Sequence, residues 1–432
     1  MLPPFEVVTR RRPVDLVAPG PAGPFLAPYV AVAAQVTGPA RVELASGDVR
    51  LTGSYGGTGA GLEVTVDGRS STHRSRRHGR PDGPVRELGL ALTGTHLSVL
   101  TRGTGPWSVR GRVDLRERVD TRDETWLAGL DGTADGAVTG FRTGRFGQLG
   151  LRDVRLVTRA DGTPYAVDGR VLLTATSAGP GFFDTAHTSV WSLDPATLEV
   201  THVSDLFFRR PDRPGAFGDH ATHLLRDGDR WLVATSTWGD FDRRRPGASV
   251  RATLAETTAD LLTGAHLLDT RPLDLPTTGL RSVGVWDPHL VRTPDGWLAG
   301  FVSATRFFRF HPALASGPTL DTLTLRAAAT DRVATEGTTL AHLDGSWRVL
   351  ASDGRDGRRG QRERYPVFDL DLRDTGTLAA PYLTNIPWPT LVPYGDSWLL
   401  VSFNGRSYGG PLPGYGTHGD LVFLRPAQRS TV

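Results

Sequence analysis

The chain has 432 residues and a formal net charge of +3, with 49 basic and 46 acidic side chains. This near balance of charge argues against a nucleic-acid partner, and no run of about 18 apolar residues indicates a membrane span. The 52 Gly and 31 Pro residues are too many chain breakers for a helical bundle. The absence of Cys excludes disulfides, thiolate metal sites and a cysteine nucleophile.

The N-terminal segment 1–24 is rich in proline, and we expect an extended arm there. Arg10, Arg11 and Arg12 are followed by Asp15 and several prolines, which interrupt any apolar stretch. We therefore see no intact signal peptide, which fits a cytoplasmic protein or a secreted one whose signal has been removed.

The next segment, 25–120, has the pattern of many short strands. Alternating apolar and polar residues occur at 62–66, 88–92 and 107–113, separated by clusters of Gly, Asp and Pro. Such spacing is typical of a β-sandwich. We expect the following segment, 121–149, to be a linker.

From residue 150 onward a repeat predicts the architecture of the remaining chain. Five segments begin at a polar or aromatic residue, continue into a short strand, turn at Asp or Gly, and enter a second strand that usually starts with Trp. The first residues of the segments are Asp153, Asp219, Asp287, Glu336 and Trp388. Repeats spaced by about 50 to 70 residues with this hairpin pattern predict a five-bladed β-propeller over 150–432. The whole chain is thus expected to be all-β.

Four of the five repeat residues are carboxylates, and this suggests chemistry. The first strand of each propeller blade lines the central channel, so these side chains should meet around one axis. Like charges there repel unless something uses them. They can instead cap turns, or hold a structural cation at the axis. Otherwise we expect no metal and no required cofactor, because His220 and His223 would point to opposite faces of a strand.

A pair of carboxyl groups in a groove is the catalytic arrangement that most glycoside hydrolases use. One carboxylic acid protonates the leaving oxygen while a carboxylate activates water. The sequence therefore predicts an enzyme rather than a purely structural propeller.

The propeller segment resembles the five-bladed glycosidases, especially glycoside hydrolase family 43. The motifs that carry the resemblance are Arg152-Asp153-Val154, Trp286-Asp287-Pro288 and Thr335-Glu336-Gly337. The resemblance implies that Asp153 is the base, that Asp287 tunes the acid, and that Glu336 is the acid. The first motif lacks the Asp-Pro pair usual in the family, so Asp161 is a rival for the base. The family's accessory sandwich commonly follows the propeller, whereas here it precedes it.

Several residues near strand starts are candidates for substrate binding. Trp286 and Trp388 lie outside the register of the repeated Trp and are expected to stack on sugar rings. Trp238 breaks the register in the same way, and Phe307 and Phe308 are expected at the rim. The remaining members of the expected substrate-binding set are Asp219, His223 and His289.

The sequence thus predicts a glycoside hydrolase that cleaves furanosides or pentose glycosides of the arabinan or arabinoxylan type, with inversion. Its partner is an oligosaccharide or polysaccharide, with no nucleic acid and no membrane, and the oligomeric state is left open. Two alternatives remain: a carbohydrate-binding propeller without catalysis, and a propeller lyase or phosphorylase that uses the same cleft.

Overall fold

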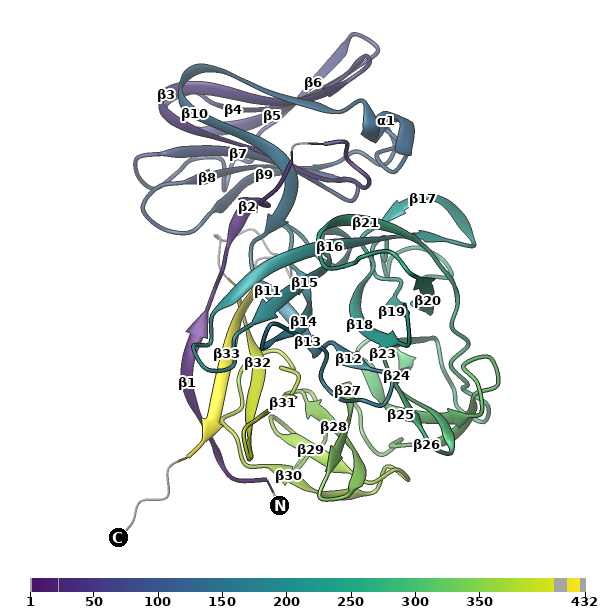
Figure 1. The fold of residues 1–432 in the computed structure, drawn as a ribbon. Coiled ribbons are helices and arrows are strands. Elements are labelled where there is room, and N and C mark those ends of the chain that lie inside the picture. The colour runs from purple at the N-terminus through teal and green to yellow at the C-terminus, as the bar shows by residue number, and fades with distance from the viewer. Residues whose placement is uncertain (1, 22, 408–417, 428–432) are drawn as a thin grey trace.

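The computed structural model describes residues 2–21, 23–407 and 418–427, and it is built almost entirely from strands. An N-terminal β-domain lies against a ring of five sheets, as Figure 1 shows. Among the described residues no helix has the length and hydropathy of a membrane span. The predicted all-β class is confirmed.

The N-terminal domain is a single sheet folded over on itself. Its elements are β2 (Asp15–Val17), β3 (Tyr29–Ser46), β4 (Val49–Tyr55), β5 (Ala60–Val66), β6 (Arg69–His73), β7 (Glu87–Thr93), β8 (His96–Arg102), β9 (Ser108–Asp114), α1 (Glu124–Ala128) and β10 (Asp131–Gln148). β3 pairs with β10 along one edge, and with β7 and then β4 along the other. The layers β4–β6 and β7–β9 therefore enclose one apolar core. The sequence predicted a β-sandwich, and in the structure the two layers belong to one continuous sheet.

The segment 121–149, predicted as a linker, belongs to this domain instead. It forms α1 and the long strand β10, which pairs with β3 from Asp131 to Arg145. The polar and glycine-rich sequence of β10 reads as a linker because much of one face is exposed to water. β10 continues toward the propeller and ends just before its first inner strand (Figure 1).

Five sheets form the remaining chain, and their inner strands surround a common centre. The first contains β11 (Leu151–Leu156), β13 (Ala166–Val167), β14 (Arg170–Ser177), β15 (His187–Leu193), β16 (Val200–Arg210), β17 (Arg213–Phe217) and β21 (Gly264–Asp269). The second contains β12 (Thr158–Arg159), β18 (His220–Asp227), β19 (Arg230–Ser236), β20 (Ala252–Thr257) and β22 (Arg271–Pro272). The short helix η1 (Phe183–Thr185) lies between β14 and β15.

The other three sheets have four strands each. The third contains β23 (Gly284–Thr293), β24 (Gly296–Arg306), β25 (Arg309–Gly317) and β26 (Thr324–Ala328). The fourth contains β27 (Thr335–Leu343), β28 (Ser346–Asp353), β29 (Tyr365–Phe368) and β30 (Asp374–Leu378). The fifth contains β31 (Thr390–Tyr394), β32 (Ser397–Ser407), β33 (His418–Pro426) and β1 (Phe5–Arg11).

The N-terminal arm closes the ring of sheets. β1 lies antiparallel to β33 as the outer strand of the fifth sheet, so the two ends of the chain complete one blade (Figure 1). Phe5 is buried among apolar residues of the fourth and fifth sheets, whereas Val8 is 49% exposed. Part of the segment predicted as an extended arm is therefore a strand of the fifth sheet.

This closure gives a test of stability. Phe5→Ala should lower the free energy of unfolding by about 3 kcal/mol, because it removes a buried aromatic ring from β1, the outer strand of the fifth sheet. Val8→Ala, on the same strand but facing solvent, should change it by less than about 0.5 kcal/mol. Urea denaturation of both variants makes the comparison, and equal effects would show that β1 does not hold the fifth sheet.

Candidate active site

A repeated backbone irregularity shapes the inner end of four sheets. The inner strands β11, β18, β23 and β27 each shift register against the next strand at the same place. The residue at this bulge has positive φ in every case: 50° at Asp153, 61° at Ala221, 57° at Asp287 and 73° at Gly337. A left-handed backbone conformation is unfavourable for residues other than Gly, Asn and Asp, and such strain is common at functional sites.

The bulge corrects the register inferred from sequence. Asp153 and Asp287 occupy equivalent positions, as predicted. Glu336 stands one residue earlier in its strand, equivalent to Arg152, His220 and Trp286. Asp219 lies one residue earlier still and has no carboxylate counterpart in the other sheets.

A cavity of about 110 Å³ opens at this end of the ring. Its polar lining consists of Arg152, Asp153, His220, Asp287, Glu336 and Asn385. Aromatic and aliphatic side chains form the remainder: Phe183, Ala221, Trp238, Phe241, Trp286, Phe307, Phe308, Phe310, Ile386 and Trp388. The structure thus brings together the three predicted catalytic carboxylates, the three predicted Trp and the two predicted rim Phe residues.

The three carboxyl groups influence one another strongly. Burial, followed by the negative charge of Asp153, raises the pKa of Glu336 to about 8. Glu336 faces the cavity and keeps some exposed surface, but protein surrounds its carboxyl group on the other sides. Burial and the charge of Glu336 raise the pKa of Asp287 well above its usual value, and the cation of Arg155 opposes this shift. Glu336 is therefore protonated at neutral pH and can donate a proton.

Three buried polar atoms in the cavity wall have no well-aligned hydrogen-bond partner among the described residues: Nε1 of Trp286, Nε1 of Trp388 and Nε2 of His220. The two indole N–H groups lie close enough to Glu336 to lower its pKa, against the larger effect of burial. His220 donates from Nδ1 to the carbonyl of Gly218 over 3.0 Å, which leaves Nε2 as an acceptor. Unsatisfied buried groups are costly, so this lining is suited to a ligand that carries hydroxyl groups.

The guanidinium of Arg155 lies beneath the carboxylates, fully buried between the inner strands. It donates to the carbonyl of Asp287 over 2.9 Å and to the carbonyl of Thr338 over 2.9 Å. It also lies 4.5 Å from the centre of the Trp388 ring. Burial lowers the pKa of Arg155 to about 10, although the charges of Asp287 and Asp153 oppose this. A side chain from the first sheet thereby contacts the third, fourth and fifth sheets.

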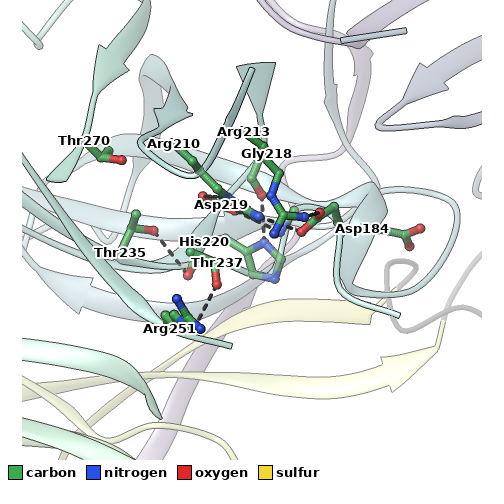
Figure 2. Close-up of polar contacts among 12 residues, drawn as sticks. Asp184, Arg210, Arg213, Gly218, Asp219, His220, Thr235, Thr237, Arg251 and Thr270 are labelled. Carbon is green, nitrogen blue, oxygen red and sulfur yellow. Dashed lines mark hydrogen bonds and ion pairs between the residues drawn. The ribbon is translucent and has the colours of Figure 1, made fainter. Parts of the chain in front are cut away.

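Asp219 is placed differently from its prediction as a substrate ligand. Its carboxylate pairs with the guanidinium of Arg210, accepts from the backbone N–H of Gly239, and is completely buried (Figure 2). It does not line the cavity. Asp219 therefore fastens the second sheet to β16, a structural role that an Asp at a strand start can have in any protein.

His223 and His289 also lie outside the cavity lining, contrary to the prediction that they bind substrate. Their rings stack 4.0 Å apart between the second and third sheets. Nδ1 of His223 accepts from the N–H of Leu290, and Nδ1 of His289 accepts from the N–H of Leu340. Each imidazole therefore joins its inner strand to the next one around the ring.

Asp161, the rival for the base, lies on an exposed turn. Its carboxylate accepts from the N–H of Thr163 over 2.9 Å, and it is not part of the cavity lining. Asp153 does line the cavity, with one oxygen 3.6 Å from Nε of Arg152. The position of Asp153 therefore favours it over Asp161.

Sequence reasoning missed Arg152, His220 and Phe183 as site residues. Arg152 and His220 could have been found by aligning the repeats at Glu336 rather than at the Asp residues, since all stand at the same bulge position. Phe183 lies between β14 and β15, and no repeat signal marks it.

Among the described residues, no group of three or more His, Asp or Glu side chains is arranged so that it could hold a metal ion. A cation at the propeller axis remains a prediction. The guanidiniums of Arg152 and Arg155 already supply positive charge beside the three carboxyl groups.

No family model and no curated protein matches the sequence. Solved structures with a similar fold include Zg3597, a family 117 glycoside hydrolase of Zobellia galactanivorans, at 11% identity and a TM-score of 0.44, over 64% of this chain and 84% of that one. Another is an inulosucrase from Halalkalicoccus jeotgali bound to kestose, at 14% identity and a TM-score of 0.47, over 65% of this chain and 85% of that one. A third is a GH43_1 enzyme from Xanthomonas citri, at 12% identity and a TM-score of 0.44, over 65% of this chain and 89% of that one. All three structures match at 14% identity or less and with TM-scores below 0.5.

Arg155 provides the first test of the site. Arg155→Met should lower the free energy of unfolding by about 3–5 kcal/mol, because it leaves buried carbonyl groups of two sheets without a donor. Arg159→Met, on the short strand β12 of the second sheet and exposed, should cost less than about 1 kcal/mol. Thermal and urea denaturation measure both, and a small loss for Arg155→Met would contradict a central structural role.

The raised pKa of Glu336 gives a test by pH. Since its folded-state pKa of about 8 exceeds the ordinary 4.5, its contribution to stability is full below pH 4.5 and is lost as the pH rises toward 8. Glu336→Gln removes this titration, so the variant should melt a few degrees above the wild type at pH 9 and gain less at pH 5. The control is Glu363→Gln in an exposed loop, which should melt like the wild type at both pH values. A pH-independent difference for Glu336→Gln would contradict the shift.

Proposed function

We propose that the protein is a glycoside hydrolase that cleaves by general acid–base catalysis. The observation that supports this best is the convergence of Asp153, Asp287 and Glu336 in one aromatic-lined cavity, with Glu336 held protonated near neutral pH. Paired carboxyl groups with separated proton affinities are what hydrolysis of a glycosidic bond needs.

Glu336 is the proton donor in this mechanism. Its raised pKa keeps the proton in place until the glycosidic oxygen accepts it, and the C–O bond to the leaving group then breaks. The two indole N–H groups near its carboxyl group stabilise the carboxylate that remains after transfer. The site therefore favours proton donation in the transition state.

Asp153 is the base that takes a proton from the attacking water. The charge of Asp153 is one cause of the raised pKa of Glu336, so the two groups act on each other across the cavity. Asp287, equivalent to Asp153 at the bulge, interacts with Glu336, whose charge is one cause of the raised pKa of Asp287. Attack by water directly on the sugar inverts the anomeric centre.

The lining suggests a small sugar as the bound unit. Trp286 and Trp388 line the cavity and are the candidates for stacking on a sugar ring, and Nε2 of His220 offers an acceptor to a hydroxyl group. The small volume of the cavity suits one sugar ring. We therefore extend the proposal to furanosides or pentose glycosides of the arabinan or arabinoxylan type.

A screen of aryl-glycosides and pentose polysaccharides is the first experiment. Hydrolysis with release of one sugar unit supports the proposal, and proton NMR of the fresh product gives the anomeric configuration. Binding of sugars without any turnover would identify a carbohydrate-binding propeller instead. Turnover that requires inorganic phosphate, or that leaves an unsaturated product, would identify a phosphorylase or a lyase.

The assignment of the acid can be tested with two leaving groups. Glu336→Gln should lower kcat by about 100-fold or more on a glycoside with a poor leaving group, and much less on an activated aryl-glycoside that needs little protonation. Asp153→Asn should lower both to a similar extent, while Asp161→Asn should lower neither. Wild-type kcat/KM should fall on the alkaline side as Glu336 loses its proton near pH 8. Near-full activity of Glu336→Gln on natural glycans would refute the assignment.

A further inference from the structure

One wall of the cavity is an aromatic cluster carried by two loops of the propeller. Phe183 lies in the loop 178–186 between β14 and β15, and Trp238 and Phe241 lie in the loop 237–251 between β19 and β20. The rings of Phe183 and Trp238 stack at 4.3 Å with an angle of 25°, and Phe241 meets Trp238 edge-on at 5.0 Å. We call these three residues the aromatic wall.

The back of the aromatic wall is held by polar residues of the N-terminal domain. Nδ1 of His96 lies 3.2 Å from a carboxylate oxygen of Asp184, the residue after Phe183. Arg116 reaches both loops, with Nη1 at 3.5 Å from Asp242 and Nη2 at 4.0 Å from Asp184. Arg122 donates from Nη2 to the carbonyl of Gly239 over 2.9 Å. Every member of the aromatic wall therefore has a neighbour in sequence that is fastened to the other domain.

These contacts are shielded from solvent more than ordinary surface pairs. The side chains of His96, Asp184 and Asp242 are only 12–14% exposed, and that of Arg116 is 23% exposed. Ion pairs at this degree of burial are screened less by salt and water than fully exposed ones. Burial tends to raise the pKa of Asp184, but the hydrogen bond and charge of His96, with Arg112 and Arg122, lower it below its ordinary value. The carboxylate is thus held in its charged form by the N-terminal domain.

The backbones of the two domains also touch at this point. At Gly94, in the turn between β7 and β8, φ is 60°, and a Cβ atom would lie 2.3 Å from the carbonyl oxygen of Asp184. Only glycine permits this approach, since any other side chain would push the loop 178–186 away. Arg112 adds a hydrogen bond of 3.1 Å to the carbonyl of Pro180 in the same loop.

We propose that the N-terminal domain completes the substrate pocket by positioning the aromatic wall, with Arg116 and His96 as the positioning residues. The inference rests on the proposed function for its substrate, a sugar ring bound against the aromatic wall. Arg116 and His96 touch neither the substrate cavity nor the strands that carry Asp153, Asp287 and Glu336. Loosening the aromatic wall should therefore weaken sugar binding while the acid–base chemistry continues.

The kinetic test compares two arginines of one segment. Arg116→Ala should raise KM about fivefold on the aryl-glycoside found by the screen, the size expected for losing about 1 kcal/mol of stacking, with kcat within twofold of wild type. Arg118→Ala is the matched control, because the side-chain hydrogen bonds of Arg118 to described residues stay within the N-terminal domain, to Ser71 over 2.7 Å and to His73. It should leave both constants unchanged. Equal KM values for the two variants would overturn the proposal.

A second readout needs no catalysis. Acrylamide should quench the tryptophan fluorescence of Arg116→Ala more than that of Arg118→Ala, because Trp238 becomes more accessible when its loop loosens. The extra quenching should vanish when Trp238→Phe is added. Should the wild type hydrolyse no glycoside, the proposed function fails while this measurement still decides the positioning role. Quenching that is identical in the two arginine variants would refute the role whether or not the enzyme is active.

If Arg116→Ala does not fold, His96→Gln is the substitute, since it removes the imidazole that lies 3.2 Å from Asp184 and keeps a polar side chain of similar length. It should increase the quenching of Trp238 and raise KM in the same direction. A His96→Gln variant with wild-type KM and wild-type quenching would contradict the proposal.

Discussion

The buried guanidinium of Arg155 is the contact on which the site depends. Propeller sheets meet mainly through side chains, so little backbone pairing holds one inner strand to another. Arg155 reaches from the first sheet to carbonyl groups of the third and fourth and lies against Trp388 of the fifth. The carbonyl it binds in the third sheet is that of Asp287 itself. The same side chain therefore fixes the inner strands and places a cation beneath the carboxyl groups.

That cation only partly offsets the negative charge above it. Asp153, Asp287 and Glu336 share one small cavity, and burial destabilises the ionised forms of Asp287 and Glu336. The state of lowest free energy at neutral pH keeps a proton on this cluster. On Glu336, that proton faces the cavity and can reach a ligand. Instability of the fully ionised site and readiness to donate a proton are thus one property, which is the usual relation between perturbed pKa and function.

The two domains have a division of labour in the proposed function. The inner strands carry the reacting groups, and their position is fixed by bulges, by Arg155 and by the imidazole links of His223 and His289. The aromatic wall is carried by loops, which are easier to displace than strands. Contacts from the N-terminal domain supply the rigidity that those loops lack, so binding of the sugar and chemistry on it have separate structural supports.

The repeat pattern alone was enough to predict an all-β chain with a ring of sheets, and it singled out Asp153, Asp219, Asp287, Glu336 and Trp388. The all-β class was predicted correctly because hydrophobic alternation and chain turns are local properties that recur in each repeat. The bulge was not visible, since a register shift depends on the partner strand; this is why Asp219 was aligned with Asp287 although it pairs with Arg210.

His223 and His289 were predicted to bind substrate for a related reason. The sequence does not show that Nδ1 of each ring accepts a backbone N–H from the neighbouring sheet. The segment 121–149 read as a linker because exposed strand residues are polar, and only pairing with β3 reveals a strand. What the sequence by itself determined was the all-β class and the repeat that places carboxyl groups near strand starts. Tertiary structure alone decided which of those groups share a cavity, what shifts their pKa, and which domain holds the aromatic wall, since each of these depends on contacts between segments far apart in the chain.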